Sequence, residues 1–159
     1  MLEFITARPE HYSQIVNLIT SPEEAFLVDP KGRFPWDESR ITQLSCERAE
    51  LTVGVKGTEV VAFANIFNRE GRVFIGNVVV SPFHRRQGVG RALLKHMLSQ
   101  LSNKLQTNAS ISVFESNTPA LRLYKQLGFE IYAKEIRSNH EGNDVLLMHM
   151  KHHNYEIPT

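Results

Sequence analysis

Hydrophobic and polar residues alternate with two different periods along the chain, and the period distinguishes strands from helices. A period of two occupies residues 51–55, 60–67 and 72–80, with Gly57 and Gly71 in the short turns between them. This pattern predicts an antiparallel meander of three strands. Four further apolar runs predict the remaining strands, at residues 2–6, 109–114, 129–137 and 145–150. The last run is apolar on both faces, so we expect it to lie inside the sheet.

Apolar residues spaced three or four apart predict about four helices. They begin near Pro9, near Asp37, directly after the glycine pair at 88–90, and at Asn117. Asparagine, aspartate and proline favour the starts of helices, and Gly128 is placed to end the last one. The elements together predict a single α/β domain of the layered α+β type over residues 1–151, with a mixed, mostly antiparallel seven-stranded sheet. Residues 152–159 are predicted to form a polar, solvated tail.

Residues 20–35 interrupt this regularity with three prolines and one glycine. They predict a loop or a broken helix, which is long for a compact domain and is therefore a candidate lid. Phe26, Phe34 and Trp36 either line a substrate pocket there or pin the loop to the core. The pattern supports both interpretations equally.

Charge and composition limit the classes of partner. A formal net charge of +1 argues against a general nucleic-acid or membrane-surface binder. No apolar run reaches the ~18 residues of a membrane span, and the start of the chain lacks a signal-peptide pattern, so we expect a cytoplasmic protein. Cys46 is the only cysteine, which excludes an intramolecular disulfide and a cysteine zinc site. We expect no metal.

The basic charge is concentrated in one stretch, His84 to Arg91, which contains Arg85, Arg86, Gly88 and Gly90. It follows a predicted strand and precedes a predicted helix. Backbone N–H groups at a helix start, together with arginines, form a site for a phosphate-type anion. The third glycine of the dinucleotide fingerprint and the nucleoside-triphosphate loop motif are both missing, so neither nucleotide interpretation holds.

A second motif follows about 26 residues downstream. It runs from Asn117 to Phe129 and reads Asn-Thr-Pro-Ala-Leu-Arg-Leu-Tyr-Lys-Gln-Leu-Gly-Phe. With both motifs in this order, the sequence resembles the GCN5-related N-acetyltransferase (GNAT) family, over roughly Val60 to Met150. The resemblance implies a GNAT-like fold whose sheet splays to open a cofactor slot, and it implies acetyl-CoA as co-substrate.

The resemblance also implies which residues hold the cofactor. Backbone groups of the Arg86–Arg91 loop would bind the pyrophosphate, with Arg85 and Arg91 as charged helpers. Backbone groups of Val78 and Val80 would pair with the pantetheine arm, and an N–H of Val79 or Val80 would face the thioester carbonyl. The full implied set is Val78, Val79, Val80, Arg85, Arg86, Gln87, Gly88, Val89, Gly90, Arg91, Asn117 and Tyr124.

Acetyl transfer needs a proton donor for the leaving thiolate and a proton acceptor for the attacking amine. Tyr124 matches the family's usual acid position, although a tyrosine on a helix face is also an ordinary core aromatic. Many related enzymes have a glutamate five residues before the asparagine, but this chain has Ser112 there. Glu115, His149 or a water remain as alternatives for the base. Glu115 is also a typical exposed loop carboxylate, and His149 a typical satisfied core histidine.

The resemblance therefore implies an N-acetyltransferase in which a primary amine attacks acetyl-CoA directly within a ternary complex. Cys46 lies away from both motifs and offers no acyl-enzyme route. The alternative is a non-catalytic acyl-CoA sensor or interaction module, which the missing glutamate at Ser112 leaves open. Residues 20–40 carry no decisive pattern, so the sequence leaves both classes of acceptor open, a small-molecule amine and a protein amine. Related proteins are often dimers, so a homodimer is compatible with the resemblance.

Overall fold

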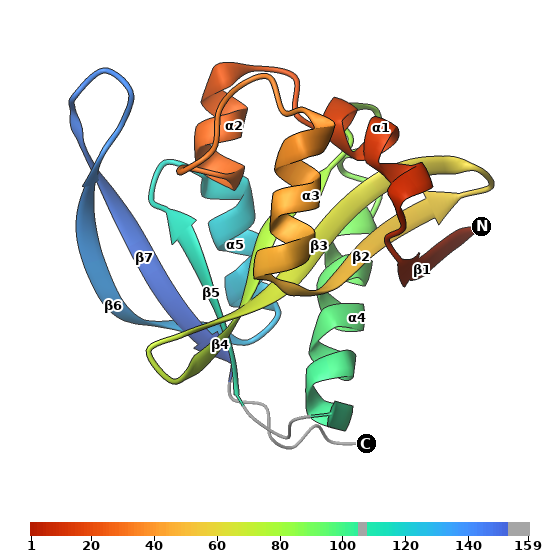
Figure 1. The fold of residues 1–159 in the computed structure, drawn as a ribbon. Helices are drawn as coiled ribbons and strands as arrows, with labels where there is room; N and C mark the ends of the chain where they lie inside the picture. Colours follow the sequence, from red (N-terminus) through yellow and green to blue (C-terminus); the bar gives the residue numbers. More distant parts are fainter. Residues whose placement is uncertain (105–107, 153–159) are drawn as a thin grey trace. The chain divides into compact units, whose positions relative to one another are not determined.

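The computed structural model of the protein describes residues 1–104 and 108–152 (Figure 1). Its strands are β1 (Leu2–Thr6), β2 (Ala49–Lys56), β3 (Glu59–Arg69), β4 (Arg72–Val80), β5 (Ala109–Phe114), β6 (Phe129–Ser138) and β7 (Asp144–His152). Its helices are α1 (Tyr12–Ile15), α2 (Pro22–Val28), α3 (Glu38–Glu47), α4 (Val89–Lys104) and α5 (Thr118–Gln126). The fold is mixed α/β with a seven-stranded, mostly antiparallel sheet, as the sequence predicts.

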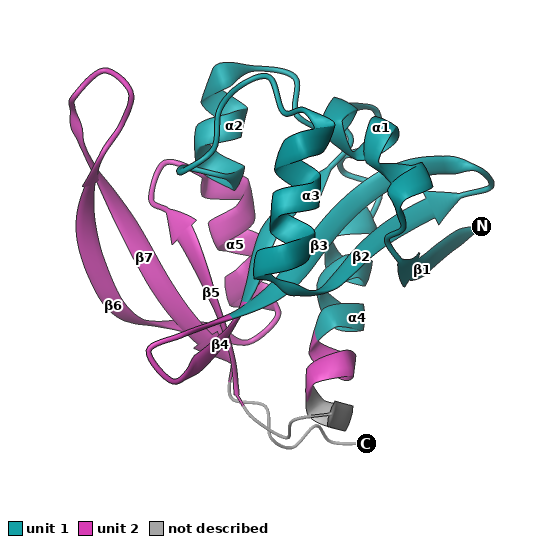
Figure 2. Ribbon diagram, viewed as in Figure 1, with its two compact units in different colours: residues 1–67, 75–97 teal, residues 68–74, 98–159 magenta. Residues whose placement is uncertain are grey.

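The chain divides into two units, one of residues 1–67 and 75–97 and one of residues 68–74 and 98–159 (Figure 2). In the first unit, β2 pairs antiparallel with both β1 and β3. Leu51, Val53 and Val55 of β2 belong to a buried cluster that includes Ile15 of α1 and Ile41 and Leu44 of α3. The burial of this apolar stripe holds α1 and α3 against one face of the strands.

On the other face of β2, Gly54 has no side chain, and neighbouring groups therefore lie close to the strand. A Cβ at Gly54 would lie 2.9 Å from the ring of Phe4 and 3.3 Å from the Cβ of Ala62. The Phe4 ring in turn stacks on His96 of α4, with 5.2 Å between the ring centroids. Figure 1 shows α3 and α4 on opposite sides of β2 and β3. The first unit is therefore layered as helix, sheet and helix.

In the second unit, β7 lies between β5 and β6 and pairs antiparallel with both. This confirms the central position predicted for the apolar run at 145–150. Helix α5 ends as predicted, because Gly128 has φ 102° and its N–H donates to the Lys125 carbonyl.

Two sequence predictions need correction. The described residues contain five helices and not four, because α2 forms within the segment predicted as a loop or broken helix. Pro22 stands in the first turn of α2 and the Ser21 side chain caps it by accepting from the Glu24 N–H, so this proline starts a helix.

The predicted tail begins one residue too early. His152 ends β7, its Nε2 lies 2.8 Å from the Leu127 carbonyl oxygen, and its ring packs on Phe129 with 5.0 Å between centroids. These contacts hold His152 in the strand, so it is not part of a solvated tail. Residues 153–159 lie outside the described part of the chain.

Candidate active site

The loop between β4 and α4 carries the first sequence motif. Ser81 anchors its start: the residue is buried, its N–H donates to the Val61 carbonyl over 2.8 Å, and its Oγ accepts from the Phe83 N–H. A short 3-10 turn at Pro82–His84 follows. Residues 85–88 are exposed, and the chain becomes buried again at Val89, where α4 begins. The loop is therefore fixed at both ends and open to solvent between them.

Two residues of this loop have left-handed backbone conformations, Arg86 with φ 62° and Gly88 with φ 81°. No atom lies within 4 Å of the place where a Cβ on Gly88 would stand, so the space beside it is open. The Ala92 N–H donates to the Gly88 carbonyl, and the amides of Val89 and Gly90 precede this first helical hydrogen bond. The arrangement has the shape and polarity of an anion site at a helix start.

Arg85 lies differently from the other loop residues, because its guanidinium turns back toward β4 and α2. Its Nε donates to the Val80 carbonyl over 3.1 Å, and its Nη2 forms an ion pair with Glu24. The contact ties the end of β4 to the start of α2. Gln87 reaches the turn between β2 and β3, where Lys56 Nζ lies 3.4 Å from its Oε1.

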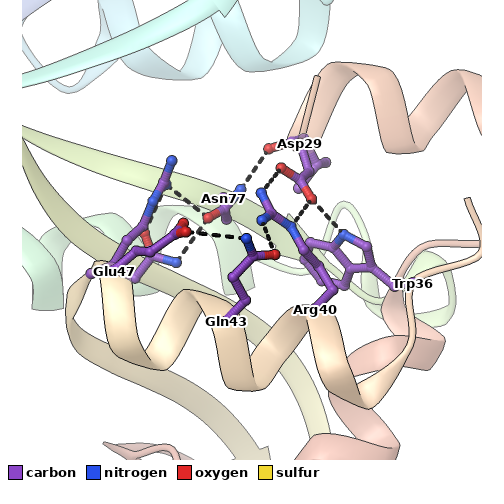
Figure 3. Close-up of polar contacts among 9 residues, drawn as sticks. Asp29, Trp36, Arg40, Gln43, Glu47 and Asn77 are labelled. Carbon is purple, nitrogen blue, oxygen red and sulfur yellow. Dashed lines mark hydrogen bonds and ion pairs between the residues drawn. The ribbon is translucent and has the colours of Figure 1, made fainter. Parts of the chain in front are cut away.

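Strand β4 carries an irregularity just before Val78, Val79 and Val80. Asn77 has φ 48° inside the strand, and its Oδ1 accepts from Arg48 over 2.8 Å and from Asn65 over 2.9 Å. Its Nδ2 donates to the Val28 carbonyl over 2.9 Å (Figure 3). A Cβ at Gly76 would lie 2.4 Å from Arg48 Nη1, so the glycine lets this side chain approach the strand backbone closely.

The segment after α2 is pinned by a buried carboxylate. Asp29 is 3% exposed, and it accepts hydrogen bonds from Trp36 Nε1 over 2.9 Å and from Arg40 Nη2 over 2.7 Å (Figure 3). Trp36 is itself buried and packs edge-on against Phe63. Of the two interpretations of the aromatics in and beside this segment, Trp36 therefore follows the second and holds the loop to the core.

The second sequence motif lies in the other unit, at the start of α5. The Asn117 carbonyl accepts from the Leu121 N–H, while the Asn117 side chain makes no capping hydrogen bond. The carboxamide is thus available to a ligand. Tyr124 is 6% exposed and packs on Phe129, with 6.0 Å between ring centroids. Burial raises the pKa of the Tyr124 phenol, so it stays protonated and can donate a proton or a hydrogen bond.

The residues considered for the base lie in different surroundings. Glu115 is exposed at the end of β5, and its backbone N–H donates to the Leu146 carbonyl. His149 is 12% exposed, and its two ring nitrogens lie 2.7 Å from Ser112 Oγ and 2.7 Å from Glu135 Oε1. The structure thus brings together Ser112 and His149, which the sequence marked separately. The hydrogen bond from His149 extends this group to Glu135, which the sequence did not mark.

Sequence reasoning missed Arg48, Asn65 and Glu135. Asn65 is fully buried within β3, and a polar residue in an otherwise apolar strand is the signal that could have marked it. Arg48 follows α3 and Glu135 stands in a strand of alternating polarity, so neither carries this signal. The partner of each could not be read from the pattern, because partners are set by the register between strands.

The fold is that of an α/β protein with an exposed, glycine-containing loop between strand β4 and the long helix α4. The chain belongs to the acetyltransferase (GNAT) family, which its residues 12–129 match. It is 34% identical to an Escherichia coli [ribosomal protein bS18]-alanine N-acetyltransferase over 98 residues, which are 60% of this chain and 65% of the relative. It is 30% identical to the Bacillus subtilis spermine/spermidine N(1)-acetyltransferase over 64 residues, 40% of this chain and 42% of the relative.

Solved structures share the fold over nearly the whole chain. The Escherichia coli ribosomal-protein-S18-alanine N-acetyltransferase covers 100% of both chains with a TM-score of 0.75 at 20% identity. The structure of yncA from Salmonella typhimurium with its cofactor acetyl-CoA covers 100% of this chain and 98% of that one, with a TM-score of 0.77 at 16% identity. Within residues 1–104 and 108–152, no helix has the length and hydrophobicity needed to cross a membrane.

Proposed function

We propose that the protein transfers the acetyl group of acetyl-CoA to a primary amine, by direct attack within a ternary complex. The observation that carries this proposal is the exposed loop at residues 85–88, with its two left-handed residues and the start of α4, in a chain of the GNAT family. The open space beside Gly88 leaves room for a diphosphate to approach the backbone closely.

In this proposal, the residues that the family resemblance marks in the two sequence motifs hold the cofactor. Amides of Arg86 to Arg91 bind the pyrophosphate, and the exposed Arg86 side chain adds positive charge. The backbone of Val78 to Val80 pairs with the pantetheine arm, while Arg85 fixes the end of this strand through the Val80 carbonyl. The Asn117 carboxamide, which is not used for capping, contacts the same arm.

Tyr124 is proposed as the proton donor to the departing thiolate. Its buried phenol has a raised pKa and therefore still carries its proton when the C–S bond begins to break. A neutral phenol stabilises the developing negative charge on sulfur by donating a hydrogen bond. In this proposal the Tyr124 hydroxyl contributes to turnover more than to the binding of the cofactor, which Tyr124 also contacts.

The acceptor amine belongs to a class that the relatives help to choose. One relative acts on an alanine of a ribosomal protein and another on spermine and spermidine. An acceptor panel should therefore contain a peptide with a free N-terminal alanine, the same peptide with a blocked N-terminus and one lysine, and spermine.

Release of thiol from acetyl-CoA across this panel tests the proposal. We expect turnover with at least one amine, and we expect Tyr124→Phe to lower kcat by about 10²-fold or more at unchanged acetyl-CoA affinity. Tyr12→Phe is the matched control, because Tyr12 is also a buried tyrosine but lies in α1. Tight binding of coenzyme A without turnover on any amine would instead support the acyl-CoA sensor.

A further inference from the structure

Three side chains from neighbouring strands of the second unit form a continuous hydrogen-bonded chain, which we name the Ser–His–Glu chain. Ser112 of β5 lies 2.7 Å from His149 Nδ1, and His149 Nε2 of β7 lies 2.7 Å from Glu135 Oε1 of β6. Arg137 Nε donates to the other oxygen of Glu135 over 2.7 Å. The strand register supports the first contact, because Ser112 is paired directly with His149.

The carboxylate at one end of the chain sets the position of every proton in it. Hydrogen bonds from Arg137 and from His149 lower the pKa of Glu135 to about 2, so this side chain is ionised and can only accept. His149 must then carry its proton on Nε2, which leaves the lone pair on Nδ1. That lone pair accepts from the Ser112 hydroxyl, whose own oxygen lone pairs remain able to accept a proton.

Packing holds the imidazole in this orientation. The ring of His149 packs near those of Phe74 and Tyr132, with centroid distances of 6.1 and 6.2 Å. The charged groups around it are Glu135 and Arg137 on β6, and Arg72 on β4, whose guanidinium lies 4.2 Å from the centre of the Tyr132 ring. One carboxylate therefore faces the imidazole directly, and the nearest arginine binds that carboxylate. A proton that reaches Nδ1 would leave the imidazole ring hydrogen-bonded to a carboxylate through Nε2.

We propose that the Ser–His–Glu chain accepts the proton that the acceptor amine must lose, in place of a carboxylate base. This inference rests on the acetyl transfer proposed above. The ammonium group of the acceptor gives one proton to Ser112 Oγ while the Ser112 hydroxyl proton moves to His149 Nδ1. The positive charge thus passes from the amine to the imidazole, where Glu135 stabilises it.

The remaining steps balance the reaction. The neutral amine forms the C–N bond, the C–S bond breaks, and the second amine proton replaces the one that Tyr124 gives to the thiolate. His149 then returns its proton to solvent through Ser112. The sum is one ammonium and one thioester converted to one amide, one thiol and one free proton. In this scheme Ser112 touches the substrate, whereas His149 and Glu135 act through it.

Steady-state kinetics of the full chain test the proposal, with acetyl-CoA and an amine that the wild type acetylates. We expect Ser112→Ala, His149→Gln and Glu135→Gln each to lower kcat by about tenfold to 10²-fold, with KM for acetyl-CoA changed less than about twofold. Ser112→Thr keeps the hydroxyl and should restore most of kcat. Ser110→Ala and His140→Gln are matched controls, because Ser110 lies two residues earlier in β5 and His140 is exposed in the turn after β6.

Two readouts separate a relay from a merely structural role. The first readout is the dependence of kcat on pH. If the imidazole must be neutral to accept the proton, kcat of the wild type should fall as the pH is lowered. This acidic limb of the pH profile should be absent in His149→Gln. In ¹⁵N NMR spectra of the unliganded protein, His149 should carry its proton on Nε2. Glu135→Gln should shift that proton to Nδ1, because the glutamine amide can donate to Nε2. Melting temperatures report whether each variant is folded.

The possible outcomes divide the two proposals. A wild type that acetylates no amine overturns both. An active wild type whose pH profile and kcat are unchanged in folded Ser112→Ala and His149→Gln overturns the relay alone. A proton on Nδ1 in the wild type also overturns the relay, since Ser112 could not then donate to it. Loss of the acidic limb together with rescue by Ser112→Thr supports it.

Discussion

Arg48 donates a hydrogen bond of 2.8 Å from Nη1 to Asn77 Oδ1 and so joins the residue after α3 to the interior of β4. Asn77 holds φ 48°, a left-handed conformation that costs most side chains about 1–2 kcal/mol. Asparagine tolerates this conformation, and here its carboxamide is also held by Asn65 and by the Val28 carbonyl. The polar network fixes the backbone immediately before Val78.

We expect Asn77→Ala to destabilise the protein by about 2–4 kcal/mol. The substitution leaves buried partners of the carboxamide without a hydrogen bond, which costs about 1–3 kcal/mol, and it adds the strain of a Cβ at positive φ. Urea unfolding at neutral pH measures the free energy.

Asn77→Gly is the matched variant, because it removes the same hydrogen bonds but tolerates the left-handed backbone. It should be more stable than Asn77→Ala by about 1 kcal/mol. Equal stability of the two variants would show that the backbone conformation contributes nothing. Wild-type stability in either would show that the network does not hold β4.

Stability should also depend on pH through Glu135. Hydrogen bonds from Arg137 and His149 hold its folded pKa at about 2, below the ordinary value of 4.5. A depressed folded pKa stabilises the protein above the unfolded value, and this contribution is lost as pH falls from about 4.5 toward 2. Glu135→Gln should therefore flatten the decline in unfolding free energy over that range. Glu141→Gln, in the exposed turn between β6 and β7, should leave the decline unchanged.

The periodic parts of the fold could be predicted from the sequence. Strands β1, β4 and β5 have the predicted boundaries, and β7 is central as its apolar residues require. Helix α2 could not be placed with certainty, because Pro22 both interrupts a helical pattern and starts a helix well. The capping contact from Ser21 to the Glu24 N–H decides between these effects, and such a contact is visible only in three dimensions.

The candidate site was predictable to the extent that its residues are consecutive. The loop before α4 and the start of α5 are continuous motifs, so their residue order alone is enough to predict a cofactor site there. The partners of Asn77 and His149 come from strands far apart in the sequence. Ser112 and His149 are 37 residues apart, and only the pairing of β5 with β7 places them opposite each other. Register depends on the packing of whole strands, which periodicity does not determine.

Tyr124 should resist ionisation in the folded protein. Burial raises the pKa of its phenol, so its contribution to stability is complete below the unfolded pKa of about 10 and is lost above it. We expect the folded wild type and Tyr124→Phe to show the same increase in phenolate absorbance up to pH 10.5. In denaturant, the wild type should show one more ionising tyrosine than the variant. A smaller increase in absorbance for folded Tyr124→Phe than for the folded wild type would contradict this, because Tyr124 would then ionise near the ordinary pKa of tyrosine.

Gly88 should matter for the cofactor, whereas Gly57 should not, although the two have similar backbones. Gly88 has φ 81° and Gly57 has φ 62°, and no atom lies within 4 Å of a Cβ built on either. Alanine at either position should cost about 1 kcal/mol of stability through backbone strain alone. Only Gly88 lies in the proposed pyrophosphate loop, so Gly88→Ala should weaken coenzyme A binding by about tenfold in calorimetry, which corresponds to about 1.4 kcal/mol. Equal coenzyme A affinity in Gly88→Ala and Gly57→Ala would show that the loop does not bind the cofactor.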